Sequence, residues 1–94
     1  MAFIQGDLIR VRATFNIGGI LTDPTTVTLK YKAPTGTITT WVYLTDNQLV
    51  RESVGSFYAD ISVTAGGTWN YRWEGTGAAQ GANQSSFEVT ATTI

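Results

Sequence analysis

The sequence predicts an all-β protein, folded as an immunoglobulin-like sandwich of about seven antiparallel strands. Apolar and polar residues alternate along most of the chain, which is the period of a strand with one buried face. Turn-forming residues interrupt this alternation at intervals of roughly eight to twelve residues, and the strand-favouring threonine and aromatic residues are abundant. A barrel is the alternative, because the number of strands alone does not exclude it.

The first two strands are expected over residues 8–17 and 26–32. Alternate side chains in both are apolar and are predicted to face the core: Ile9, Val11, Ala13, Phe15, Ile17, Val27, Leu29 and Tyr31. Residues 18–19 and 22–25 separate the two strands, since glycine permits positive φ and proline cannot donate a ladder hydrogen bond. A turn with Pro34 ends the second strand.

The third strand, over residues 37–44, has two apolar faces. Ile38, Val42 and Leu44 lie on one, and Trp41 and Tyr43 on the other. If the aliphatic face is buried, the two rings lie exposed beside polar residues of adjoining strands, including Arg72 and Glu74, and form a face that suits a sugar ring or a partner protein. If the aromatic face is buried, Trp41 resembles the buried tryptophan of immunoglobulin domains. The sequence leaves both interpretations open.

The second half of the chain predicts a hairpin over residues 48–63, then two further strands over 68–74 and 84–92. The first of these two strands has three aromatic residues on one face: Trp69, Tyr71 and Trp73. Each large aromatic side chain can bury roughly 150–250 Å², so this strand should supply the largest part of the core. The glycine-rich residues 75–83 are expected to form a flexible loop.

The composition favours binding and assembly over catalysis. The 94 residues make one domain, and they include no histidine and no cysteine. The commonest general base, the thiolate nucleophile and nearly every transition-metal site are therefore missing together. We expect no enzyme activity, no cofactor and no metal. The net charge of −1 also gives no strong field toward nucleic acid or a membrane, so neither is an expected partner.

Residues 1–6 are expected to form a short N-terminal arm. This segment lacks the basic and apolar regions of a signal peptide, which predicts a soluble product made in the cytoplasm. Phe3 and Ile4 carry apolar side chains ahead of the first clear strand. They are candidates for contact with a neighbouring subunit, either in a groove or as an added strand.

Four basic residues occupy the outward positions of the first two strands: Arg10, Arg12, Lys30 and Lys32. If those strands pair, the four side chains form one basic patch that could meet an acidic partner surface. The alternative is a solvated face whose charges block edge aggregation, with Asp60 on a neighbouring strand partly neutralising it.

The order and spacing of several segments resemble a known family. These segments are Gly6 to Phe15, Asp23 to Leu29, Pro34 to Gly36 and Gly67 to Gly77. Together they resemble the small immunoglobulin-like virion accessory proteins of tailed bacteriophages and prophages. The resemblance implies a non-enzymatic structural protein of the virion, made in the bacterial cytoplasm.

Within that family, capsid decoration or cementing is the first expectation, and a head–tail or tail/baseplate accessory is the alternative. The implied partners are other virion proteins of the capsid or tail, or copies of the chain itself. A carbohydrate-binding module that attaches particles to a host glycan is an alternative of a different class, and it depends on exposure of Trp41 and Tyr43.

Overall fold

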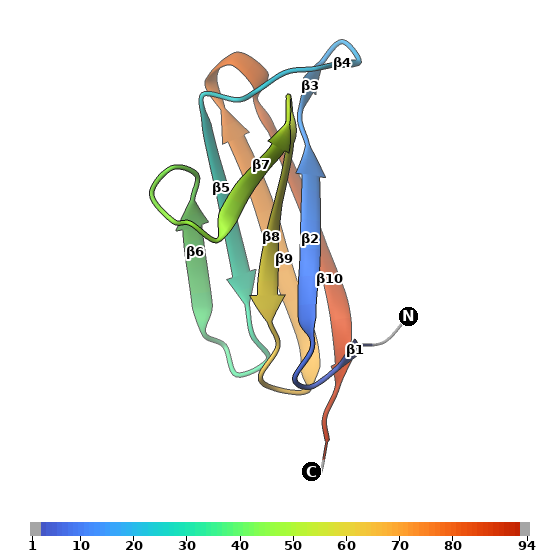
Figure 1. Cartoon of the computed structure of the whole chain (residues 1–94). Coiled ribbons are helices and arrows are strands. Elements are labelled where there is room, and N and C mark those ends of the chain that lie inside the picture. Colours follow the sequence, from blue (N-terminus) through green and yellow to red (C-terminus); the bar gives the residue numbers. More distant parts are fainter. Residues whose placement is uncertain (1–2, 93–94) are drawn as a thin grey trace.

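The computed structural model describes residues 3–92 and shows an all-β sandwich of two packed sheets (Figure 1). Five strands in the order β1-β10-β9-β5-β6 form sheet A, and three in the order β2-β8-β7 form sheet B. The strands β3 and β4 form a separate hairpin at one end. The predicted all-β sandwich is therefore confirmed, although the strands are not all antiparallel, since β1 pairs with β10 in parallel.

The strand bounds follow the predicted alternation closely. Sheet A contains β1 (Phe3–Ile4), β5 (Thr26–Lys32), β6 (Ile38–Val42), β9 (Gly67–Thr76) and β10 (Gly81–Thr90). Sheet B contains β2 (Leu8–Thr14), β7 (Leu49–Ser53) and β8 (Ser56–Ser62). The remaining elements are β3 (Asn16–Ile17), β4 (Ile20–Leu21) and the 3₁₀ turn η1 (Gly77–Ala79).

The core lies between the two sheets and follows the period of two. Sheet B contributes mainly aliphatic and small side chains, while sheet A adds Trp69 and Trp73, which are 3% and 0% exposed. The Trp69 ring stacks on Phe87 at a centroid distance of 6.3 Å, and Tyr71 packs against the same ring. The predicted aromatic face of β9 is therefore confirmed as part of the core.

Trp41 and Tyr43 lie on the core side of sheet A. Trp41 is directly opposite the buried Leu29 in the β5–β6 register, so the two side chains share a face. Its ring meets Tyr31 edge-on at 5.1 Å, and Tyr43 meets Phe57 of the opposite sheet at 5.1 Å. Both rings are half-buried against the core. The alternative in which the aliphatic face is buried and the two rings are exposed is therefore wrong.

The aliphatic residues of the same segment are exposed instead. Ile38 is 63% exposed, because its side chain lies on the opposite side of β6 from Trp41. Leu44 is 87% exposed, because it lies in the loop after β6. Leu44 also has a positive φ of 73°, so the alternation of a regular strand does not continue to this position.

Two other expectations are wrong at the ends of strands. Ile17, predicted to face the core, is 53% exposed because β3 pairs with β4 in a hairpin beyond the sandwich. Gly18 and Gly19 make its two-residue turn with φ of 57° and 86°, a left-handed conformation that glycine adopts without strain. Residues 75–83, predicted to be a flexible loop, instead lengthen β9 and β10 and join them through η1.

Candidate interaction surface

The four basic residues on the outward faces of the first two strands do not form one patch. Arg10 and Arg12 belong to β2, which pairs with β8, whereas Lys30 and Lys32 belong to β5, which pairs with β6 and β9. The chain crosses from one sheet to the other between β2 and β5. The predicted patch is therefore wrong, because its two halves lie on opposite sides of the sandwich.

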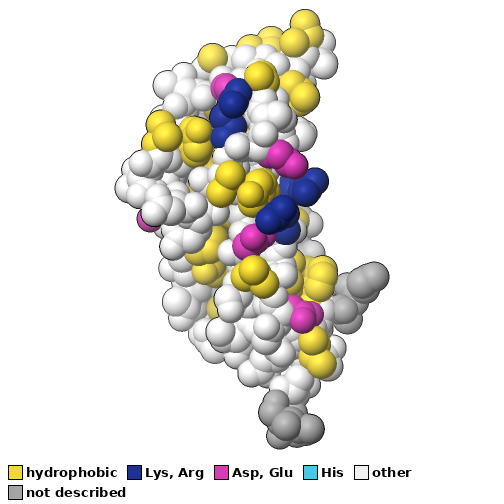
Figure 2. Space-filling model, viewed as in Figure 1, with side chains coloured by type: hydrophobic (Ala, Val, Ile, Leu, Met, Phe, Trp, Pro, Cys, Tyr) yellow, Lys and Arg dark blue, Asp and Glu magenta, His cyan; other side chains and the backbone are white. Residues whose placement is uncertain are grey.

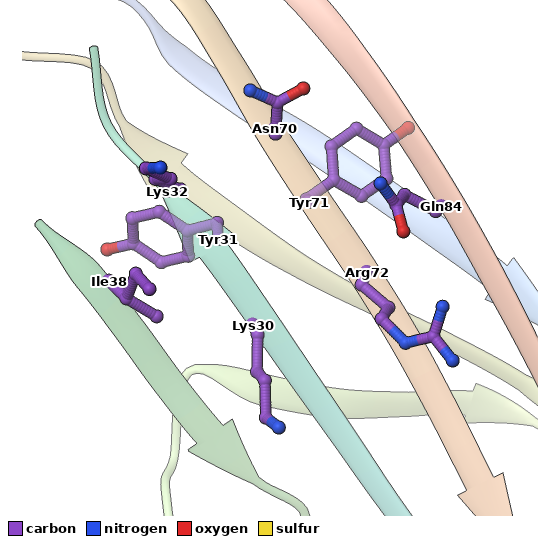
Figure 3. A pocket seen from close by; sticks show the side chains of 8 residues that line it. All are labelled: Lys30, Tyr31, Lys32, Ile38, Asn70, Tyr71, Arg72 and Gln84. Carbon is purple, nitrogen blue, oxygen red and sulfur yellow. The ribbon is translucent and has the colours of Figure 1, made fainter. Parts of the chain in front are cut away.

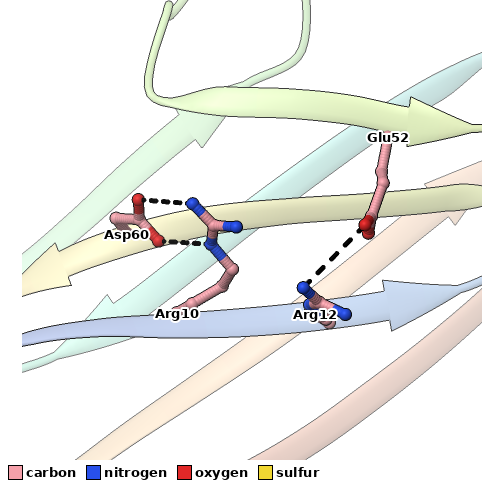
Figure 4. A network of polar contacts seen from close by, with 4 residues as sticks. All are labelled: Arg10, Arg12, Glu52 and Asp60. Atoms are coloured by element: carbon pink, nitrogen blue, oxygen red, sulfur yellow. Dashed lines mark hydrogen bonds and ion pairs between the residues drawn. The ribbon is translucent and has the colours of Figure 1, made fainter.

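On the outer face of sheet B, each arginine has its own carboxylate (Figure 4). Arg10 donates from Nε and Nη2 to the two oxygens of Asp60 at 2.9 and 3.2 Å, and its guanidinium lies over the Tyr58 ring. Arg12 lies 3.8 Å from Glu52. The hydrogen bonds from Arg10 lower the pKa of Asp60. In Figure 2 the basic and acidic side chains of this face accordingly lie next to each other.

On the outer face of sheet A, cations outnumber their carboxylate partners. Lys30 lies directly opposite Arg72 in the β5–β9 register, and like charges in such a pair repel. The two share one oxygen of Glu74, at 3.7 Å from Lys30 Nζ and 3.3 Å from Arg72 Nε. Lys32 lies opposite Asn70 on the same face, adding a third cation. This face has an excess of positive charge that the opposite face lacks.

A shallow pocket of about 170 Å³ is centred on these residues (Figure 3). Its lining comes from β5, β6, β9 and β10: Lys30, Tyr31, Lys32, Ile38, Asn70, Tyr71, Arg72 and Gln84. We call the outward-facing polar residues of this set the cationic face: Lys30, Lys32, Asn70, Arg72 and Gln84. All five side chains carry N–H donors, so the face offers more donors than acceptors.

The predicted face that combined Trp41 and Tyr43 with Arg72 and Glu74 is divided by the strand register. The two rings point to the core, and the two charged side chains point outward, where Lys30 joins them. Asn70 was expected on this outward face, but Gln84 was not among the predicted site residues. The outward position of Gln84 is visible in the alternation of β10, but the sequence does not show that β10 pairs with β9 and β9 with β5.

Phe3 and Ile4 belong to the sheet of their own domain. They form β1 and pair in parallel with Val89 and Thr90 of β10, and the Phe3 ring meets Phe87 edge-on at 5.6 Å. Ile4 is 50% exposed. Residues 3–4 are thus a short edge strand instead of a free arm, and their contact with a partner stays a prediction. The first two residues of the predicted arm lie outside the described residues.

A second exposed feature is apolar. Ile17, Ile20 and Leu21 of the β3–β4 hairpin and Val54 of the β7–β8 turn are exposed, and we call them the apolar tip. Asp23 ties the hairpin's base to that turn, since it accepts a 2.7 Å hydrogen bond from Gly55 N and another from Arg51. Yellow side chains mark this end of the molecule in Figure 2.

Comparison with known proteins finds no matching family model, no matching curated protein and no matching solved structure. Within residues 3–92, no three acidic side chains gather in a way that could hold a metal ion. The same residues include no helix that is long and apolar enough to cross a membrane.

Proposed function

We propose that this chain is a non-enzymatic structural protein of a bacteriophage virion that decorates or cements the capsid, and that it attaches through the cationic face. One observation supports the choice of the cationic face as the attachment surface. Lys30 and Arg72 oppose each other across two strands and share the single carboxylate of Glu74, whereas Arg10 and Arg12 have one partner each. A carboxylate from another protein would relieve this repulsion.

The chemistry of the face favours an acidic protein surface as the partner. Arg72 offers a planar donor fork that matches a carboxylate, and Lys30 and Lys32 add mobile point charges beside it. Asn70 and Gln84 extend the set of donors across neighbouring strands. The residues lie on paired strands, so their backbone positions, although not the ends of the lysine side chains, are fixed before the partner arrives.

The sequence left two alternative functions open, and the structure bears on only one of them. A head–tail or tail/baseplate position would use the same face against a different virion protein, and only the location in the particle separates it from decoration. The glycan-binding alternative loses its aromatic platform, because Trp41 and Tyr43 face the core. Glycan binding is therefore not proposed as a second function.

The virion role is tested by purifying particles from an induced lysate of the bacterium that encodes the chain. The chain should sediment with the particles in a density gradient, at a fixed ratio to the major capsid protein by quantitative mass spectrometry. Its location is then read by immunogold labelling of the capsid or tail. A chain that stays at the top of the gradient with the soluble proteins would contradict the proposal.

The attachment surface is tested with two matched double variants. Lys30→Thr with Lys32→Thr removes two charges from sheet A, and Arg10→Thr with Arg12→Thr removes two from sheet B. The first should weaken attachment roughly tenfold or more at low salt and less at high salt, because exposed charges are screened. The second should bind as the parent does. Equal losses in both variants would show that overall charge matters and the cationic face does not.

A further inference from the structure

Part of β10 forms an unpaired edge of sheet A. In the described residues β1 pairs only with Val89 and Thr90, so β10 is the outermost strand from Gly81 to Ser86 (Figure 1). An unpaired edge presents a row of backbone N–H and C=O groups that can pair with another strand.

The other sheet edges carry features that disfavour pairing. β2 has the charged Arg10 and Arg12, and β7 has an irregularity between Arg51 and Ser53. β6 is partly closed by its own loop, because Asp46 accepts a hydrogen bond from Val42 N and donates its N–H to Val42 O, both at 2.8 Å. Charges, bulges and covering loops are the usual protection of edge strands.

The first six residues of β10, from Gly81 to Ser86, have none of these features, because they include no charged side chain and no proline. The one charged residue of the strand, Glu88, lies two residues further along, next to the pairing with β1. The first six residues also overhang the sandwich: Asn83 and Ser85 lie opposite Trp73 and Tyr71 on the inward row, yet both are exposed. A hollow of about 140 Å³ separates residues 13–16 from residues 80–83 at the start of this edge, and β2 pairs with β8 and not with β10.

We propose that the occupant of this edge is the β10 strand of a second copy of the chain, paired antiparallel about a twofold axis between Asn83 and Ser86. The segment is self-complementary, because asparagine, glutamine and serine each carry both a donor and an acceptor. No register of this pairing places like charges opposite each other, and the net charge of −1 gives little repulsion between copies.

Such pairing joins two copies of sheet A into one continuous sheet. A twofold axis between antiparallel strands is perpendicular to the sheet, so both cationic faces lie on the same side. The inference does not rest on the virion role, because it concerns only the chain and its copy. A six-residue contact is smaller than the roughly 800 Å² per partner of stable interfaces, so we expect a reversible dimer at high concentration.

Cysteine scanning tests the pairing directly, because the parent chain has no cysteine. Gln84→Cys, Ser85→Cys and Ser86→Cys are oxidised one at a time under mild conditions. A disulfide needs Cα atoms about 4.4–6.8 Å apart, so one or two adjacent positions should give a covalent dimer. Thr40→Cys, on the β6 edge of the same sheet, is the control and should stay monomeric. No crosslink at any of the three positions, or equal crosslinking at Thr40, would overturn the proposal.

Sedimentation velocity gives an independent test. The parent chain should show a rising weight-average mass between about 10 µM and about 1 mM, the range of weak association. Ser85→Lys should remain monomeric, because it places a charge on the edge next to its symmetry copy. The side chain of Ser85 is exposed, so the variant should keep its fold by circular dichroism. A parent chain that is monomeric at every concentration would also overturn the proposal.

Discussion

Sheet A and sheet B perform the same task on their inner faces and differ on their outer faces. Both bury an alternating row of apolar side chains, although sheet A supplies aromatic rings and sheet B mainly aliphatic and small residues. Outside, sheet B matches Arg10 with Asp60 and Arg12 with Glu52, while sheet A leaves Lys30 and Arg72 to share Glu74. Folding constrains the inner faces, so the unmatched outer face is where a binding role is to be sought.

The largest effect should come from the inner face of sheet A. Trp73 is 0% exposed, and Trp73→Ala should lower the free energy of unfolding by about 3–5 kcal/mol, through lost burial and the cavity left behind. Urea unfolding followed by circular dichroism measures this change. Lys30→Thr on the outer face of the same sheet is the control. A Trp73→Ala variant with parental stability would mean that the ring is not in the core.

A smaller difference should separate the two tryptophans. Trp69 Nε1 donates a 3.0 Å hydrogen bond to Ala65 O, whereas the buried Trp73 Nε1 has no partner among the described residues. Trp69→Phe loses a hydrogen bond, while Trp73→Phe removes an unsatisfied donor. We expect Trp69→Phe to be the more destabilising by about 1 kcal/mol in the same urea assay. The reverse order would indicate that Trp73 Nε1 is satisfied in solution.

The outer faces should respond in opposite ways to removal of one cation. Arg10→Thr leaves Asp60 without its hydrogen-bond donor and should slightly lower the melting temperature. Lys30→Thr relieves the repulsion with Arg72 and should leave the melting temperature unchanged or slightly raised. Both shifts should shrink at high salt, since the groups are exposed. If Lys30→Thr destabilises as Arg10→Thr does, the two faces are electrostatically equivalent.

The smallest effect concerns pH. The hydrogen bonds from Arg10 lower the pKa of Asp60 from its ordinary value of 3.8, so the stabilisation they give is fully present above that value. It is lost as the pH falls through the lower pKa of the folded state. The gap in melting temperature between the parent and Arg10→Thr should therefore be constant from about pH 5 to pH 7 and close below about pH 4. If the difference in melting temperature persists in acid, its cause is the lost packing of Arg10 on Tyr58 and not the hydrogen bonds to Asp60.

Strand alternation made much of the fold predictable. The inward rows of β2, β5, β8 and β9 follow directly from the period of two, because a one-residue shift would expose every apolar side chain. The expectation failed at Ile17, where Gly18 and Gly19 form a hairpin turn that takes the strand out of the core. The segment with Trp41 has apolar residues on both faces, and only its pairing with Leu29 decides the direction.

The candidate site was less predictable, because it depends on which strands are neighbours. The sequence shows that Arg10 and Lys30 point outward, but it does not show that they lie on different sheets. Likewise Arg72 joins Lys30 only through the β5–β9 pairing, whose members are about forty residues apart in the chain. Long-range pairing of this kind leaves no local signal in one sequence.

The pairing of β1 with β10 has a mechanical consequence. Gln5 donates its N–H to Thr90 O at 2.9 Å and its side-chain amide to Thr64 O, while its side-chain oxygen accepts from Thr92 N. Because β1 and β10 are parallel, a force that pulls the two ends of the domain apart slides one strand along the other. The hydrogen bonds between them then share the load at the same moment instead of opening one after another. The domain should accordingly resist stretching from its ends more strongly than separation of strands at the β3–β4 hairpin.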